Sequence, residues 1–151
     1  MDNNNQKNVI FHIDVNSAFL SWEAVYRVNV LGEKTDLRDI PSAVGGSRES
    51  RHGIILAKSQ QAKKFGVVTG EPIVSAQKKC PALNIVPPNH ALYLEYSEQF
   101  ISLLKKYAPV VEQYSIDEAF LDMTGTEKLY GSPIQFANRL KDEIRDTLGF
   151  T

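Results

Sequence analysis

Three acidic residues lie where apolar, strand-like runs of sequence end. Asp117 and Glu118 separate two such runs, 110–114 and 119–123, a pattern that predicts a β-hairpin with acid at its tip. Another strand-like run, near the N-terminus, leads directly into Asp14. If the three carboxylates meet at one sheet edge, they repel each other unless a cation lies among them, and ligation by oxygen alone indicates Mg²⁺ rather than zinc. A solvated acidic turn is the plainer alternative for Asp117 and Glu118.

Composition sets the class of protein. With 151 residues, of which 42% are hydrophobic, the chain can form one domain with a core, or one domain with a small insertion. No stretch approaches the roughly 18 apolar residues of a membrane span, and residues 1–7 lack the apolar core of a signal peptide, so we expect a cytoplasmic protein without a membrane partner. The single cysteine, Cys80, cannot form an internal disulfide and argues against zinc.

The net charge of −1 conceals a basic middle segment between acidic ends. Residues 48–79 hold seven Lys or Arg against two Glu, whereas residues 1–47 and 80–151 each carry a net negative charge. A solvated basic face is one interpretation. The other is a phosphate-facing surface set opposite an acidic metal site.

Apolar spacing and turn residues predict the elements that must position these groups. Helices are expected at 18–31, 59–66, 75–80, 89–108 and 133–148, and strands at 8–13, 42–44, 53–57, 83–86, 110–114 and 119–123. This order indicates an α+β fold with a largely antiparallel sheet and an insertion at about 18–76. Phe19, Trp22 and Tyr26 share one helix face, and we assign Trp22 and Tyr26 to the core. Phe19 is less certain, because it lies five residues beyond Asp14.

Several motifs resemble those of one family. Residues 11–19, followed by Glu23, resemble the first motif of the Y-family (DinB/UmuC-type) translesion DNA polymerases, and residues 115–122 resemble their most characteristic signature. Residues 43–46, 62–67 and 80–81 match further motifs in the same order. The resemblance covers nearly everything from residue 8 to residue 124, and it is specific because several unrelated motifs occur together.

The resemblance implies a ferredoxin-like palm, with a mostly antiparallel sheet and helices on one face, and a small inserted fingers subdomain. The implied boundaries are 1–17 for the first palm strand, 18–76 for the fingers and 77–151 for the rest of the palm. It implies template-directed transfer of a nucleotide from a deoxynucleoside triphosphate to a primer end, with two Mg²⁺ ions. The implied metal ligands are Asp14, Asp117, Glu118 and the backbone carbonyl of Val15. Primer–template DNA is the implied partner, with a sliding clamp contacted through regions outside these residues.

Other residues of the family's nucleotide site also have counterparts. Phe19 matches the steric gate, the aromatic side chain that excludes a ribose 2′-hydroxyl. Gln60 and Lys63 occupy positions where relatives usually have tyrosine and arginine in contact with the triphosphate. Lys63 keeps the positive charge but lacks the bidentate fork of arginine. The three histidines, His12, His52 and His90, are expected to be packed or surface residues rather than metal ligands.

Length is the main departure from the family. Relatives continue with another palm strand, a thumb and a DNA-gripping little finger, so we interpret the chain as an N-terminal catalytic fragment with weak or no activity by itself. A non-catalytic DNA-binding or regulatory remnant is the alternative from another class. The cluster of three acids counts against a remnant, and Phe19 counts against a nucleotide cyclase built on a related palm.

Overall fold

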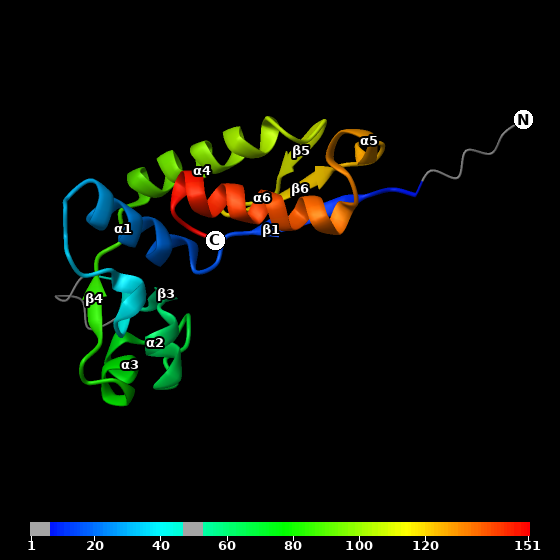
Figure 1. Cartoon of the computed structure of the whole chain (residues 1–151). Coiled ribbons are helices and arrows are strands. Elements are labelled where there is room, and N and C mark those ends of the chain that lie inside the picture. Colours follow the sequence, from blue (N-terminus) through cyan, green and yellow to red (C-terminus); the bar gives the residue numbers. More distant parts are fainter. Residues whose placement is uncertain (1–6, 47–52) are drawn as a thin grey trace, which may run out of the picture. The chain divides into compact units, whose positions relative to one another are not determined.

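Two separate three-stranded sheets organise the part of the chain that the structure describes (Figure 1). The computed structural model describes residues 7–46 and 53–151. The chain divides into two compact units, one formed by Met1–Val15 with Leu94–Thr151 and the other by Asn16–Tyr93. Each unit contains one of the sheets. Within the described residues, no helix has the length and apolarity that crossing a membrane requires.

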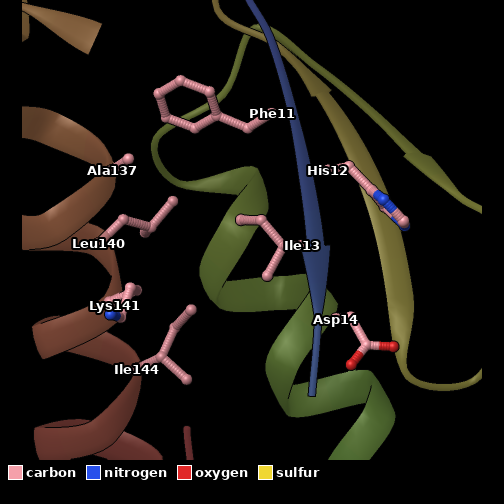
Figure 2. Close-up of a pocket in the computed structure, with 8 residues that line it drawn as sticks. All are labelled: Phe11, His12, Ile13, Asp14, Ala137, Leu140, Lys141 and Ile144. Atoms are coloured by element: carbon pink, nitrogen blue, oxygen red, sulfur yellow. The ribbon is translucent and has the colours of Figure 1, made fainter. Parts of the chain in front are cut away.

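The sheet of the first unit has the strand order β1-β6-β5 and is antiparallel throughout. Its strands are β1 (Ile10–Asp14), β5 (Val110–Gln113) and β6 (Glu118–Asp122). Because side chains alternate along a strand, Phe11 and Ile13 point toward α6 (Pro133–Leu148), whereas His12 and Asp14 point to the opposite face (Figure 2). The sheet therefore has one face packed on a helix and one face that carries the polar side chains.

The two ends and the buried face of helix α6 can be explained from its sequence. The side chain of Ser132 accepts a hydrogen bond from the backbone N–H of Gln135, and Gly149 ends the helix in a left-handed conformation with φ of 83°. Three apolar residues at four-residue intervals are buried: Phe136, Leu140 and Ile144. A cavity remains between this face of α6 and β1, lined largely by apolar side chains (Figure 2).

Two further helices complete the first unit. Helix α4 (His90–Lys105) begins within the second unit and joins β4 to β5 in the chain, and the short α5 (Glu127–Tyr130) precedes α6. Phe150 is fully buried and packs edge-on against Tyr96 and Phe100 of α4, with ring centroids 6.2 and 6.4 Å away. The chain after α6 is thus held in the core of this unit.

The second unit is a small sheet covered by short helices. Strand β2 (Ser42–Gly45) pairs antiparallel with β3 (Ile55–Lys58) and parallel with β4 (Asn84–Val86). The helices are α1 (Ala18–Asn29), the 3₁₀ turn η1 (Leu37–Asp39), α2 (Gln60–Lys64) and α3 (Ile73–Lys79). One apolar cluster, which includes the side chains of Ile55, Val67 and Cys80, forms a core of this unit.

The α+β class and the predominance of antiparallel pairing are confirmed. Every predicted helix and strand has a counterpart, while η1 and α5 were not predicted, because each is only a turn or so long and carries no apolar periodicity. Ser17, the residue before α1, has φ of 47° and makes no side-chain capping bond. His52 and two of the seven Lys or Arg residues of the basic segment 48–79, Arg48 and Arg51, lie outside the described residues.

Candidate active site

Strand pairing brings the three acidic residues that were predicted to bind metal to one end of the first unit's sheet. Asp14, the last residue of β1, lies directly opposite Glu118, the first residue of β6. One residue further on, the backbone N–H of Val15 donates to the carbonyl oxygen of Asp117 at 3.0 Å. Two pairs of neighbouring residues therefore form one locus, although about a hundred positions separate the pairs in the chain. The pairs are Asp14 with Val15 and Asp117 with Glu118.

The charges of this locus repel one another. Partial burial, together with the nearby carboxylates of Asp117 and Glu118, raises the pKa of Asp14 above its ordinary value, and His12 partly offsets the rise. A set of oxygen donors that disfavours its own negative charge fits a hard divalent cation such as Mg²⁺. The oxygen donors at this end of the sheet thus fit the Mg²⁺ expected from the sequence.

The three carboxylate side chains, however, are not oriented as a complete set of metal ligands. Within residues 7–46 and 53–151, no three His, Cys, Asp or Glu side chains are arranged to hold a metal ion. Instead, Glu118 Oε1 lies 3.1 Å from His12 Nε2, and Glu118 Oε2 lies 3.1 Å from Ser115 Oγ. The hydroxyl of Ser115 also lies 2.8 Å from Asp117 Oδ1. The backbone assembles the locus, while neighbouring polar groups engage two of its three carboxylates.

Replacing Asp14 by Asn should stabilise the metal-free chain at neutral pH. Because folding raises the pKa of Asp14, the ionised carboxylate costs stability once the pH exceeds the ordinary aspartate value. We expect a melting temperature about 2 °C higher for Asp14→Asn, a small gain because solvent screens this exposed group. The gain should vanish in acid, where both chains are neutral at this position. A thermal melt that shows Asp14→Asn destabilised at neutral pH would contradict the repulsion.

Phe19, the predicted steric gate, belongs to the second unit and is packed against other rings there. Its ring stacks on that of Tyr93, with centroids 4.6 Å apart and planes 15° from parallel. Trp22, which is fully buried, and His90 contact the same ring at centroid distances of 6.2 and 5.8 Å. Trp22 is buried in the core as predicted, whereas Tyr26, which was also assigned to the core, is only partly buried. Phe19 itself is half-buried at the margin of this aromatic group.

Tyr93, the ring on which Phe19 stacks, is hydrogen-bonded to the buried carboxylate of Glu23. The Tyr93 hydroxyl donates to Glu23 Oε2 at 3.2 Å, and Arg27 Nε donates to Glu23 Oε1 at 2.9 Å. Burial is the main cause that raises the pKa of Tyr93 to about 12, and the neighbouring Glu23 adds to it. No role was predicted for Tyr93 from the sequence. Its position, three residues before Tyr96 and seven before Phe100, nevertheless places all three on one helix face.

Gln60 and Lys63 share the exposed side of α2, three positions apart, while Ala62 between them is buried. The helix begins as predicted: Ser59 Oγ accepts a hydrogen bond from the N–H of Ala62 at 3.0 Å. Both side chains are thus available for contact with a polar ligand, and their assignment to a triphosphate stays a prediction.

Two residues that contact this locus had no functional role predicted for them. His12 lies two residues before Asp14, and Ser115 lies two residues before Asp117. The two-residue repeat of a strand was a signal for His12, because it places His12 on the same face as Asp14. Ser115 is the first residue of the motif at 115–122, and nothing in its spacing indicated that it would contact both neighbouring acids.

Comparison with known proteins points to one family. Residues 13–151 match the family model described as "impB/mucB/samB family". The chain is 50% identical over 143 residues to a DNA polymerase IV of Clostridium acetobutylicum, covering 95% of this chain and 36% of that protein. It is 43% identical over 141 residues to a DNA polymerase IV of Alkaliphilus oremlandii, covering 93% and 34%. The chain therefore spans about a third of the length of these relatives.

Solved structures with a similar fold agree with this. The structure of DinB from Sulfolobus solfataricus matches with a TM-score of 0.76 and 29% identity, covering 94% of this chain and 40% of that one. A structure described as the insertion ternary complex of Dbh DNA polymerase matches with a TM-score of 0.77 and 29% identity, with the same coverage.

Proposed function

This chain belongs to the impB/mucB/samB family of Y-family DNA polymerases, and from that membership we propose that it forms the catalytic part of a translesion DNA polymerase. The reaction is template-directed transfer of a nucleotide from a deoxynucleoside triphosphate to a primer end. The observation that carries the proposal is the locus at the end of β1 and β6, where Asp14 opposes Glu118 and Val15 is bonded to Asp117.

At this locus the chain's own groups would bind and orient two Mg²⁺ ions. Asp14, Asp117 and Glu118 would supply carboxylate oxygens, and Val15 its backbone carbonyl. The ions, when bound, lower the pKa of the primer 3′-hydroxyl and neutralise charge on the leaving pyrophosphate. The acids would hold the ions and transfer no proton themselves. Metal binding requires accessible carboxylates, and all three are at least partly exposed to solvent.

In the second unit, Phe19 would select the sugar, and Gln60 and Lys63 would contact the triphosphate. The stack of Phe19 on the anchored Tyr93 supports this role, because a steric filter works only if the ring cannot move aside. We propose accordingly that 18–76 act as fingers, that 1–17 and 77–151 act as palm, and that primer–template DNA is the partner. A sliding clamp would bind through regions beyond this chain.

A chimera tests the proposal. The chain would be joined to the remainder of the Clostridium acetobutylicum relative, in place of the segment that it matches, and primer extension would be measured on undamaged and lesion-containing templates. We expect extension on both templates that depends on Mg²⁺. A folded chimera that binds primer–template DNA but does not extend it would favour the alternative function, a non-catalytic DNA-binding remnant. The 151-residue chain alone serves as the comparison and is expected to extend weakly or not at all.

A further inference from the structure

His12 contacts one of the predicted metal ligands from the neighbouring strand. Its Nε2 lies 3.1 Å from Glu118 Oε1, and since a carboxylate oxygen can only accept, the imidazole nitrogen is the donor. The two residues are 106 positions apart in the chain and meet only because β1 and β6 pair. His12 therefore fixes the direction of a carboxylate that belongs to the other strand.

The other neighbour of Glu118, Ser115, cannot serve both adjacent acids at once. A hydroxyl carries a single hydrogen, and Ser115 Oγ lies 2.8 Å from Asp117 Oδ1 but 3.1 Å from Glu118 Oε2. The contact with Asp117 is the shorter one and is therefore favoured for that hydrogen. His12 is then the donor that orients Glu118.

The imidazole is itself held in place by stacking. The ring of His12 lies nearly parallel to that of Phe120, its partner in the strand register, with centroids 4.4 Å apart and an interplanar angle of 12°. Tyr114 packs edge-on against the same phenyl ring at 5.9 Å. About half of the His12 side chain stays exposed, so replacing it disturbs little of the core.

We propose that His12 is a positioning residue for Glu118, and that it sets the affinity of the locus for divalent metal by holding that carboxylate in the correct orientation. The proposal rests on the proposed function, in which Glu118 is a metal ligand. Hydrogen-bonded partners of metal ligands commonly change metal affinity by about 10- to 100-fold when they are removed. His12 would thus act on the metal without touching it.

Two substitutions separate the hydrogen bond from the stack. His12→Phe keeps an aromatic ring on Phe120 but has no donor, whereas His12→Gln keeps a donor within reach but has no ring. Binding of Mn²⁺ alone to the 151-residue chain would be measured by electron paramagnetic resonance. We expect His12→Phe to weaken Mn²⁺ binding by about tenfold or more and His12→Gln to change it by less than about threefold. Thermal melts without metal establish that both variants fold.

The outcomes are distinguishable. If both variants bind Mn²⁺ like the unchanged chain, or if His12→Gln is the weaker binder, the positioning role is wrong while the metal site stands. If both lose affinity equally, the ring and not the hydrogen bond matters, and the role is again wrong. If the unchanged chain binds no Mn²⁺, or binds it as well after Asp14→Asn, the metal site of the proposed function fails as well.

Discussion

Asp117→Asn should reduce primer extension by the chimera by about a thousandfold. The amide has the shape of the carboxylate but neither its charge nor its metal affinity, so the locus would lose one of its three anionic ligands. Metal ions supply several kcal/mol of charge stabilisation in the transition state, and about 4 kcal/mol corresponds to roughly three powers of ten in rate. The measurement is the single-turnover rate of nucleotide addition at saturating Mg²⁺.

A matched control for this change lies at the far end of β6, the strand that follows Asp117. Asp122 ends β6, and its Oδ1 accepts a hydrogen bond from the N–H of Thr124 at 3.0 Å, a bond that belongs to the turn. Hydrogen bonds from Thr124 also lower the pKa of Asp122. We expect Asp122→Asn to extend primers within a few-fold of the unchanged chimera. Rapid extension by Asp117→Asn would refute the assignment of this locus as the catalytic centre.

Phe19→Ala should raise the incorporation of ribonucleotides by the chimera by about tenfold to a hundredfold. The physical reason is steric: forcing an extra group against a packed ring costs about 1–3 kcal/mol, and truncation to a methyl group removes that cost. The ring has little freedom to yield, since it stacks on Tyr93, whose hydroxyl is bonded to the buried Glu23. The measurement is the ratio of kcat/KM for a deoxynucleotide to that for its ribonucleotide.

Two companion variants distinguish a sugar filter from a general loss of packing. Phe19→Tyr keeps the ring and should keep the discrimination of the unchanged chimera. Tyr93→Phe keeps the stack but loses the hydrogen bond to Glu23, so it should lower the melting temperature more than it changes sugar choice. An unaltered ratio in Phe19→Ala would exclude Phe19 as the gate, whatever its effect on the rate with deoxynucleotides.

Much of the local structure could be predicted from the sequence. The apolar runs that end in Asp14 and flank Asp117 become β1 and the hairpin of β5 and β6. The helix predicted at 133–148 is α6, which has Ser132 as its N-cap and ends at Gly149. These features depend on alternation, on helical periodicity and on residues with special turn or capping geometry, all of which act over a few positions of the chain.

The contacts that make a site out of these elements were decided by the tertiary structure. Residue types alone supplied the acids, but the pairing register placed Asp14 opposite Glu118, and a shift of one residue would have turned Glu118 to the other face. The same holds for His12 on Glu118 and for Tyr93 on Glu23, which join residues 106 and 70 positions apart. Such contacts depend on how whole strands and helices pack, and local periodicity carries no information about which distant side chains will meet.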